Sequence, residues 1–457
     1  MNYTFPSWTA IILAAGQGKR MRSALPKVLH PLAGRPMVRY VVDAAREAGF
    51  ARCLVVVGPD ADGVRAALGD RVTYVTQAEP LGTGNAVAQA QQAAGDTEQI
   101  LVLNGDVPLI TAQALARLAR SHEEQGADLT FLTAQMEHAG EYGRVVRDGD
   151  GRVTDVVEAP ERDTETAGPA EINAGQYCFQ AGWLWSRLAA LPQSGNGEYY
   201  LTSLVSTAVQ EGAALLPVPA VTPDEVRGIN DRAQLAQAEA LLRERINRRH
   251  LLAGVSLIDP ATAYIDADVT IEQDTVIEPN THLRGVTAVG RACHLGPNTT
   301  VRDSTLGDRC RILDSTVEEA TLEEDVDVGP YSHLRSGAYL CAGVHIGNFA
   351  EVKNARLGRG VKMGHFSYIG DAEIGDETNI GAGTITCNFD GKEKHRTVVG
   401  ERVFIGSDTM LVAPVTIGDG ARTGAGSVIN KDVPPGALAV GAPARIMRGQ
   451  DGEQAAT

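Results

Sequence analysis

The sequence predicts a chain of two architectures, an α/β domain followed by a parallel β-solenoid, with one helix between them. Three observations lead to this prediction. Apolar strand-like runs alternate with helix-like stretches over residues 8–230, and residues 231–252 read as a single helix. The last third repeats an aliphatic residue every six positions, as in I-G-D-E-T-N from Ile374 and I-G-A-G-T-I from Ile380, which is the signature of a solenoid. The length of 457 residues agrees with more than one domain.

The first domain, residues 1–230, is predicted to hold a parallel sheet with helices on both faces. Its strand-like runs are hydrophobic throughout, as in A-I-I-L-A-A-G (10–16), R-C-L-V-V-V-G (52–58) and I-L-V-L-N-G-D (100–106). The run M-V-R-Y-V-V-D-A-A-R-E-A-G (37–49) reads as a helix that ends at glycine. Such a domain binds its ligands at the carboxyl ends of the strands. The loop-rich region 142–175 is expected to form a second lobe that faces the substrate.

Residues 231–254 are predicted to form the connecting helix. Leu235, Ala238, Leu242 and Ile246 lie along one face of this helix. Asp231 lies at its start, where the helix dipole favours a carboxylate.

The second domain, residues 255–457, is predicted to be the solenoid. With three hexads per coil, the repeats from about Ser256 to Val440 make roughly ten coils, and a strand spacing of about 4.8 Å gives a rod about 50 Å long. The rhythm breaks at T-C-N-F-D-G-K-E-K-H-R-T-V (386–398), which must form a loop, and loops on a rigid scaffold tend to carry function. The polar tail from Gly449 is expected to be disordered.

Composition excludes several functional classes. A net charge of −16 makes the chain a poor candidate for binding nucleic acid or an anionic membrane. The six cysteines form no C-x-x-C pair, which argues against a disulfide framework or a zinc site and favours free thiols in a reducing compartment. The N-terminus lacks the features of a secretory signal, and no apolar run is long enough to cross a bilayer. We therefore expect a cytoplasmic protein.

The segment L-A-A-G-Q-G-K-R-M (13–21) follows the first predicted strand and is a candidate phosphate-binding loop. Gly16 and Gly18 let backbone N–H groups approach a phosphate chain, and Arg20 and Lys27 add positive charge. Its spacing differs from that of a Walker A loop, and it is not G-x-G-x-x-G because position 21 is methionine. Taken alone, the segment is also compatible with a plain tight turn. Together with Pro26-Lys27 it resembles the signature of the sugar-phosphate nucleotidyltransferases, L-x-x-G-x-G-T-R-M followed by P-K, with lysine at position 19 in place of the usual threonine.

Further motifs downstream support this resemblance. They are Q-A-E-P-L-G-T-G-N-A (77–86), L-N-G-D-V-P (103–108), Y-G-R (142–144), V-V-E (156–158), I-N-A-G (172–175) and G-I-N-D (228–231). Asp106 ends a hydrophobic strand, where a lone carboxylate is more simply a metal ligand than a packing residue. Magnesium takes hard oxygen donors and keeps several waters. The resemblance assigns its protein ligands to Asp106 and Asn230, and the alternative for Asn230 is a helix cap before the connector.

The same resemblance implies how the other residues bind substrate. Gln77, Gly82 and Thr83 would hold the uracil of UTP, and Lys27 would pair with its phosphates. The sugar would be held by Gly143, Glu158, Asn173 and Asn230. The implied UTP-binding set also includes Leu13, Ala14, Ala15, Gly16, Asn104, Gly105 and Asp106. The reaction would be an in-line attack of a sugar 1-phosphate on the α-phosphorus of UTP, with Mg²⁺, Arg20 and Lys27 neutralising charge as pyrophosphate leaves.

Three residues of the solenoid stand out as candidates for a second chemistry. Arg335 and Lys353 are eighteen residues apart, which is one coil, so we expect them to stack on one face and to need an anion between them. His365 is the third residue of its hexad, where Asp, Asn or Gly is more usual. A histidine beside a phosphate site is a natural general base, because its pKa lies near neutrality. The alternative for His365 is a corner residue with a purely structural role.

The segment T-N-I-G-A-G-T-I-T-C-N-F-D-G (378–391) resembles the motif of a known family, the bifunctional N-acetylglucosamine-1-phosphate uridylyltransferase/glucosamine-1-phosphate acetyltransferases. The resemblance runs from about Thr9 to Ala442. It implies a Rossmann-like nucleotidyltransferase domain, a connecting helix and a left-handed parallel β-helix. It also implies a homotrimer in which the acetyltransferase sites lie between subunits and the 386–398 loop reaches across.

The family resemblance assigns roles in acetyl transfer. It implies that His365 is the proton acceptor. Glucosamine 1-phosphate would be bound by Arg335, Lys353, Tyr368 and Asn379, and acetyl-CoA by Ala382, Asn388, Phe389, Ser407 and Ala425. This chain departs from the family pattern in two places. Phe389 replaces a tyrosine, and Ala442 stands where some relatives place an arginine for the cofactor phosphates, so that Arg445 is the nearest candidate.

The sequence therefore predicts an enzyme of two steps. The solenoid would acetylate glucosamine 1-phosphate from acetyl-CoA, and the N-terminal domain would join the product to UTP. The final product would be UDP-N-acetylglucosamine, a precursor of cell-wall polysaccharide. One alternative is a single-activity sugar-1-phosphate nucleotidyltransferase with a structural β-helix. Another is a regulatory subunit built from the same two modules, which would have no need of Lys27 and Asp106.

Overall fold

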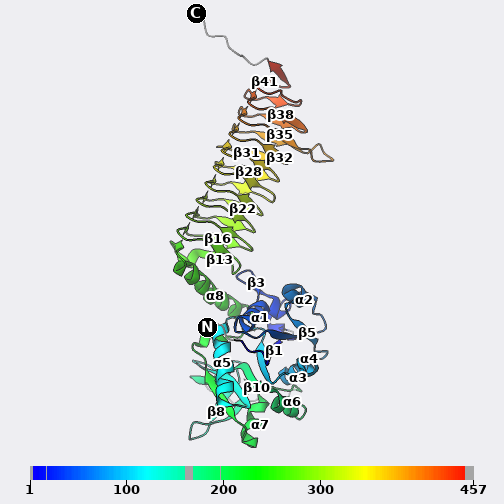
Figure 1. The fold of residues 1–457 in the computed structure, drawn as a ribbon, viewed down its shortest axis with the longest axis vertical. Coiled ribbons are helices and arrows are strands. Elements are labelled where there is room, and N and C mark those ends of the chain that lie inside the picture. The colour runs from blue at the N-terminus through cyan, green and yellow to red at the C-terminus, as the bar shows by residue number, and fades with distance from the viewer. Residues whose placement is uncertain (1–3, 17, 160–167, 196, 448–457) are drawn as a thin grey trace, which may run out of the picture. The chain divides into compact units, whose positions relative to one another are not determined.

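Strand β1 (Trp8–Leu13) is an interior strand of the N-terminal sheet, and its residues are buried on both faces, as a hydrophobic run predicts. The computed structural model describes residues 4–16, 18–159, 168–195 and 197–447, so the predicted polar tail from Gly449 lies outside the described residues. The chain divides into two compact units, Met1–Leu242 and Arg243–Thr457 (Figure 1). Each unit is described by itself below.

The N-terminal unit holds a nine-stranded sheet. Its strand order is β11-β7-β10-β6-β1-β4-β5, with β8 paired to β10 and β9 paired to β8. The other strands of this sheet have the bounds β4 (Arg52–Val57), β5 (Thr73–Thr76), β6 (Gln99–Asn104), β7 (Leu129–Met136), β8 (Arg144–Arg147), β9 (Val153–Val157), β10 (Ala170–Gln180) and β11 (Leu215–Pro219). A separate two-stranded sheet is formed by β2 (Pro31–Leu32) and β3 (Arg35–Pro36).

The prediction of a parallel sheet is wrong for part of this unit. Strands β6 and β4 flank β1 in parallel, and β5 continues this order beside β4. Strand β10, however, is antiparallel to both β6 and β7. The chain leaves β7, passes through the antiparallel pair β8–β9 and enters β10, and the described residues of this connection contain no crossover helix of the kind that a parallel neighbour requires. The sheet is therefore mixed, and the predicted substrate-facing lobe supplies the antiparallel strands.

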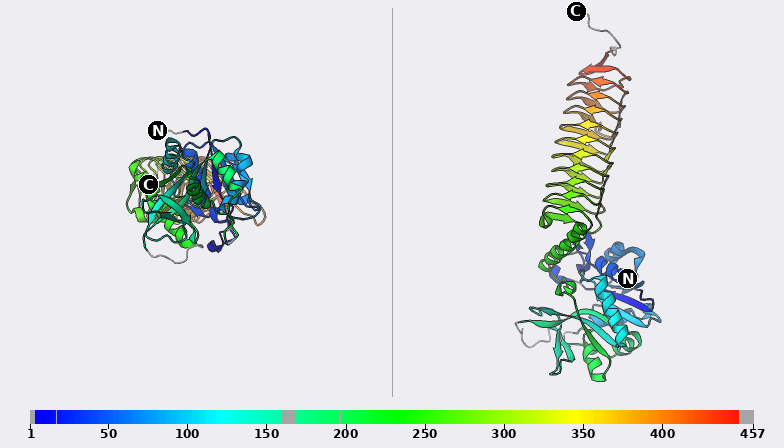
Figure 2. Two further views of the ribbon diagram at one scale, coloured as in Figure 1. Left: turned by 90° about the horizontal axis from the view of Figure 1, so that it is seen from below. Right: turned by 60° about the vertical axis from the view of Figure 1, so that its left-hand side comes forward.

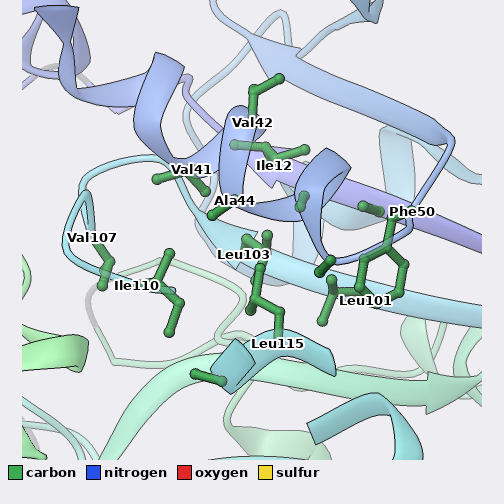
Figure 3. Packing of buried hydrophobic residues seen from close by; sticks show 14 of the residues in the cluster. Ile12, Val41, Val42, Ala44, Phe50, Leu101, Leu103, Val107, Ile110 and Leu115 are labelled. Carbon is green, nitrogen blue, oxygen red and sulfur yellow. The ribbon is translucent and has the colours of Figure 1, made fainter. Parts of the chain in front are cut away.

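Helices cover both faces of the sheet. Alternate residues of β1 point to opposite sides, so Ile12 joins one buried cluster and Ile11 the other. Ile12 packs with Leu101 and Leu103 of β6 against the helices α1 and α5, whose bounds are given next (Figure 3). The helices have the bounds α1 (Met37–Glu47), α2 (Asp62–Leu68), α3 (Thr83–Gln89), α4 (Gln91–Ala94), α5 (Ala112–Gln125), α6 (Ala181–Leu188) and α7 (Ser203–Glu211).

A buried histidine on α5 is held in its neutral form. The ring nitrogens of His122 lie 2.8 Å from the hydroxyl of Thr130 and 3.0 Å from the amide oxygen of Gln99. An amide oxygen only accepts, so Nε2 carries the proton and Nδ1 accepts from the Thr130 hydroxyl. Burial lowers the pKa of His122 to about 4, from an ordinary value of 6.5.

The N-terminal unit is therefore expected to lose stability between about pH 6.5 and pH 4. In this range the unfolded chain binds a proton at His122 that the folded chain does not, so stability rises with pH and falls on acidification, by about 3 kcal/mol in total. Unfolding followed by tryptophan fluorescence measures this unit alone, because Trp8, Trp183 and Trp185 all belong to it. His122→Gln should flatten the pH dependence, and an unchanged slope in that variant would assign the loss to other groups.

The connecting segment forms a long helix, α8 (Arg232–Leu252). Its cap is Asp231, whose carboxylate accepts a hydrogen bond from the backbone N–H of Gln234 at 2.8 Å. Ala238, Leu242 and Ile246 are buried along its length, as one hydrophobic face requires. None of the helices in the described ranges combines the length and the hydropathy of a membrane span.

The second unit is a parallel β-helix whose strands stack in three sheets (Figure 2). The first solenoid sheet runs from β12 (Ser256–Leu257) and includes β30 (Lys362–Met363), β33 (Asn379–Ile380), β36 (Phe404–Ile405) and β39 (Arg422–Thr423). The second includes β25 (His333–Leu334), β28 (Ala350–Lys353), β31 (Ser367–Gly370), β34 (Ile385–Cys387), β37 (Met410–Val412) and β40 (Val428–Ile429). The third includes β29 (Arg356–Leu357), β32 (Ala372–Ile374), β35 (Thr397–Val399) and β38 (Val415–Ile417). The second sheet has ten strands.

Aliphatic side chains fill the interior of the solenoid. Leu334, Val352 and Ile369 pair in successive coils and are each fully buried. Burying such a side chain stabilises the fold by about 1.5–3 kcal/mol, so the stack of inward residues holds the coils together. The predicted break in the rhythm lies between β34 and β35, where Phe389 and Lys394 form an isolated antiparallel bridge at the base of a projecting loop (Figure 1).

Candidate active sites

The N-terminal unit has two adjoining cavities at the carboxyl ends of its central strands. A larger cavity of about 500 Å³ lies beside the 13–21 loop, and a smaller one of about 180 Å³ lies beside β8–β10. Both cavities are lined by Leu13 at the end of β1 and Asn104 at the end of β6. They also share Thr83, Asp106 and Asn230. This is the edge of the sheet at which the sequence predicted ligand binding.

The larger cavity, here called the nucleotide cavity, collects most of the predicted UTP-binding residues. It is lined by Leu13, Ala15, Gly16, Arg20, Lys27, Gln77, Gly82, Thr83, Asn104, Asp106 and Asn230. Ala14 instead lines a neighbouring cavity of about 230 Å³. Gly105 lines none of these cavities, and its N–H donates to the carbonyl of Leu13 at 2.9 Å. A Cβ at position 105 would lie 2.8 Å from that oxygen, so glycine is needed there for strand packing.

The two halves of the phosphate-loop motif touch each other. Gly18 has φ +60°, and a Cβ there would lie 2.5 Å from the Cβ of Lys27. Glycine therefore permits both the left-handed turn and the close approach of the lysine stem. The short 3₁₀ turn Lys27–Leu29 then directs the lysine into the nucleotide cavity.

The ammonium group of Lys27 joins the two residues that the sequence proposed as magnesium ligands. Its Nζ contacts a carboxylate oxygen of Asp106 and lies 2.9 Å from the amide oxygen of Asn230. The carbonyl of Asp106 accepts from the N–H of Ile229 at 3.0 Å, which places Asn230 beside this carboxylate. The alternative role for Asn230 is not seen, because Asp231 caps α8.

These two oxygens suit a small divalent cation. The carboxylate of Asp106 and the amide oxygen of Asn230 are hard donors, and both contact the same ammonium group, so they lie close together. Water and substrate phosphates would complete an octahedral set of ligands around a cation at this point. Within the described residues, no cluster of three or more His, Cys, Asp or Glu side chains could hold a metal by itself. The arrangement therefore fits a cation that is shared with a phosphorylated substrate.

The smaller cavity, here called the sugar cavity, collects Gly143, Glu158, Asn173 and Asn230. The hydroxyl of Thr202 donates to the carboxylate of Glu158 at 2.8 Å. The N–H of Asn173 donates to the carbonyl of Gly143 at 2.8 Å. Burial, helped by the charge of Glu158, raises the pKa of Tyr177 at the wall of this cavity. All four predicted sugar-binding residues are thus brought together.

In the solenoid, four predicted residues occupy one corner of successive coils. His365, Ala382, Ser407 and Ala425 lie where the chain passes from the first solenoid sheet to the second. For each pair of neighbouring coils, the strand pairs before and after this corner are offset by the same number of residues, so the four residues align in a column. His365 is exposed at the surface of this column.

Three of the four predicted sugar-phosphate residues lie on the second solenoid sheet. Arg335 follows β25 and aligns with Lys353, because Leu334 pairs with Val352. Tyr368 lies one coil further on, in β31. A Cβ at Gly370 would lie 2.3 Å from the Tyr368 hydroxyl, so glycine makes room for this ring next to the partner position of Lys353. Asn379 lies on the first sheet, before the corner that carries His365 and Ala382.

The inference that stacked cations require a bound anion is wrong for one of them. Arg335 already forms an ion pair with Glu351, with an N–O distance of 2.6 Å. The coil repeat places this glutamate beside it, so the charge of Arg335 is balanced within the protein. Lys353, in contrast, makes no ion pair with any residue that the structure describes.

The remaining acetyl-CoA candidates lie away from the His365 column. Asn388 donates from its side chain to Asp371 at 2.5 Å, at the corner where the second sheet passes to the third. Phe389 follows it in the projecting loop and is 60% exposed. The loop is ordered by Asp390, which accepts from two backbone N–H groups and from His395, and these bonds hold its pKa well below the usual range. Arg445 lies in the terminal strand β42 (Ala444–Met447), opposite Val440 of β41 (Leu438–Gly441).

Comparisons with known proteins agree with these two sites. Residues 10–208 match the family of MobA-like NTP transferase domains, and residues 396–431 match the bacterial transferase hexapeptide family. The chain is 48% identical to the Bifunctional protein GlmU of Trichlorobacter lovleyi over 94% of this chain and 95% of that protein. It is similar to the proteins of the same name from Pelobacter propionicus (48%, 96% of each chain) and Heliobacterium modesticaldum (45%, 94% and 95%).

The chain belongs to the bifunctional GlmU family.

GlmU membership confirms the predicted family, fold class and pair of activities. The chain is a bifunctional transferase with nucleotidyltransferase and acetyltransferase activities. The MobA-like match lies in the unit with the mixed sheet, and the hexapeptide match lies in the left-handed parallel β-helix. The alternatives of a single-activity nucleotidyltransferase and of a regulatory subunit are therefore set aside.

Sequence reasoning missed several residues that shape the GlmU sites. Tyr199 is clamped against the 81–84 turn, where its N–H donates to Leu81 and its carbonyl accepts from Gly84, each at 2.8 Å. A Cβ at Gly82 would lie 2.7 Å from the carbonyl of Tyr199. Thr202, three residues later, holds Glu158. These residues belong to no motif that the sequence analysis recognised, and it is the fold that brings the 198–202 segment to the 81–84 turn.

Proposed function

We propose that the N-terminal cleft transfers the uridylyl group of UTP to N-acetylglucosamine 1-phosphate. The geometry that supports this most directly is the contact of Lys27 with both Asp106 and Asn230, between the nucleotide cavity and the sugar cavity. A phosphorylated sugar in the smaller cavity and a nucleoside triphosphate in the larger one would meet at this point. The bond from the sugar phosphate oxygen to the α-phosphorus forms there as the bond to the β-phosphate oxygen breaks.

In this proposal, residues at the junction of the cavities orient the phosphates. Asp106 and Asn230 would hold Mg²⁺, which when bound neutralises phosphate charge and fixes the triphosphate. Lys27 and Arg20 line the nucleotide cavity and would meet the negative charge that develops on the leaving pyrophosphate. Gln77 is buried, and its side-chain amide donates to the carbonyl of Gly82 at 3.2 Å. This bond would hold the 81–84 turn in place against the base.

We infer that the solenoid acetylates glucosamine 1-phosphate first. His365 would take a proton from the attacking amine as the new C–N bond forms and the thioester C–S bond breaks, and the thiolate of coenzyme A leaves and takes up a proton. Lys353 would hold the sugar phosphate, with the hydroxyl of Tyr368 beside it. Arg335, balanced by Glu351, would contribute less charge to this phosphate than the sequence alone suggested.

We also infer a homotrimer with shared acetyltransferase sites. In one chain the His365 column and the Asn388–Phe389 loop start from opposite edges of the second solenoid sheet, so a neighbouring copy could bring the loop of one chain to the column of another. Large aromatic side chains next to the column are exposed, as a buried interface would require: Tyr331 60%, Phe349 62% and Phe366 56%. The six cysteines are free thiols, which suits the reducing cytoplasm in which we place the enzyme.

The reaction order can be tested with the purified chain. It is incubated with glucosamine 1-phosphate, acetyl-CoA, UTP and Mg²⁺, and the products are followed by mass spectrometry with each component omitted in turn. We expect UDP-N-acetylglucosamine only in the complete mixture, and N-acetylglucosamine 1-phosphate to build up without UTP. Uridylylation of added N-acetylglucosamine 1-phosphate without any acetylated sugar from the solenoid would contradict the acetyl half of the proposal.

A further inference from the structure

Glu141 lies between the proposed metal ligand Asn230 and the phosphate-loop residue Arg20. It belongs to the turn between β7 and β8, which is closed by a hydrogen bond from the N–H of Tyr142 to the carbonyl of Ala139 at 3.0 Å. The hydroxyl of Tyr142 accepts from the N–H of Gly228 at 2.8 Å. This bond ties the turn to the 228–230 segment, and so the position of Glu141 beside Asn230 is built into the backbone.

The first contact of Glu141 fixes the orientation of an amide. The Nδ2 of Asn230 donates to a carboxylate oxygen of Glu141 at 3.1 Å, while its Oδ1 accepts from Lys27 at 2.9 Å. An ionised carboxylate can only accept and an ammonium can only donate. Only one of the two flipped orientations of Asn230 satisfies both partners, and that orientation turns the oxygen toward Asp106 and Lys27.

The backbone of Asn230 is held as well. Its N–H donates to the side-chain oxygen of Gln234 at 2.6 Å. With the backbone fixed by α8 and the NH₂ group held by Glu141, the amide oxygen is the one polar atom of the side chain left to face a cation. Such outer partners typically decide how well a ligand is aimed at its metal.

The second contact of Glu141 is an ion pair with Arg20. The guanidinium of Arg20 contacts the other carboxylate oxygen, and the two side chains are 55% and 50% exposed. Arg20 lines the nucleotide cavity, whereas Glu141 lines the sugar cavity. An exposed pair of this kind is worth about 0.2–1 kcal/mol, so a triphosphate can displace it easily.

We propose that Glu141 is a positioning residue for uridylyl transfer, which turns the amide oxygen of Asn230 toward the divalent cation and holds Arg20 until the triphosphate of UTP takes its place. This inference rests on the proposed function, in which Asp106 and Asn230 hold the cation. Glu141 itself touches neither the reacting phosphorus nor the cation. Its two effects have opposite signs, because the first strengthens metal binding and the second competes with UTP for Arg20.

Two variants of Glu141 separate these effects. Glu141→Ala removes both contacts, whereas Glu141→Gln keeps an oxygen that can accept from Asn230 and removes the charge that holds Arg20. We measure binding of Mn²⁺ to the full chain saturated with UDP-N-acetylglucosamine, from the EPR signal of the free ion, and the KM for UTP. Glu141→Ala should weaken Mn²⁺ binding by about tenfold. Glu141→Gln should leave it near the wild-type value and lower the KM for UTP by up to about fivefold.

Reference variants make each failure distinguishable. Asp106→Ala and Asn230→Ala should each weaken Mn²⁺ binding, and if neither does, the metal role in the proposed function is wrong. If they do and Glu141→Ala binds Mn²⁺ like the wild type, the positioning role of Glu141 is overturned. Glu211→Ala is a matched control, because Glu211 forms an exposed ion pair with Arg187 at 3.1 Å in the same unit. It should change neither quantity, and acetyl transfer should be unaffected in all these variants.

Discussion

Replacement of His365 by alanine is expected to abolish acetyl transfer and to leave uridylyl transfer intact. A general base in the transition state contributes about 10²–10⁴-fold to the rate, so the acetylation kcat should fall by at least a hundredfold. His365 is exposed at a corner of the solenoid, where its removal opens no cavity in the stack of aliphatic residues. The loss should therefore appear in kcat, with little change in the thermal stability of the solenoid.

The control for this result lies one coil earlier in the same column. Asn348 aligns with His365, because the strands before and after this corner are shifted by the same number of residues between the two coils. Asn348→Ala should acetylate at a rate close to that of the wild type. Acetylation is assayed by release of coenzyme A thiol, and uridylyl transfer by release of pyrophosphate from UTP and added N-acetylglucosamine 1-phosphate. Retained acetylation in His365→Ala would show that another group accepts the proton.

The six-residue repeat explains why so much of the solenoid could be predicted. A fixed repeat of eighteen residues per coil allowed Arg335 and Lys353 to be aligned from the sequence alone, and the pairing of Leu334 with Val352 confirms this alignment. The repeat carries no information on what lies beside a side chain on the outer surface. Arg335 was therefore expected to need a bound anion, while the structure supplies Glu351.

The N-terminal domain was less predictable for a different physical reason. Hydrophobic runs identify strands, but their direction depends on how the chain connects them, and β10 runs antiparallel to both β6 and β7. Motifs located the carboxyl ends of β1 and β6, where Leu13 and Asp106 line the cavities. Contacts between segments that are far apart in the chain, such as that of Glu141 with Asn230, produce no pattern that can be recognised in the sequence.

Replacement of Asp106 by alanine should have the opposite outcome to that of His365. The side chain of Asp106 is only 21% exposed and contacts the Lys27 ammonium, which is 13% exposed, so this charge is partly shielded from water. Removing it leaves the ammonium with the amide oxygen of Asn230 as its remaining partner at the junction of the two cavities. The carboxylate also supplies the charge that a divalent cation needs there. We expect the uridylyl transfer rate to fall by about 10²–10³-fold or more, and acetylation to continue.

Asp106→Asn distinguishes charge from shape in this loss. Asparagine keeps the size of the side chain and an oxygen that can accept from Lys27, but it lacks the negative charge. If charge is what matters, Asp106→Asn should be nearly as slow as Asp106→Ala and should need more Mg²⁺ for half-maximal rate. Asp60, an exposed carboxylate three residues after β4 that lines neither the nucleotide cavity nor the sugar cavity, provides the control, and Asp60→Ala should leave the rate unchanged. Wild-type rates in Asp106→Asn would mean that this carboxylate acts through packing and hydrogen bonding, and that the cation is held elsewhere.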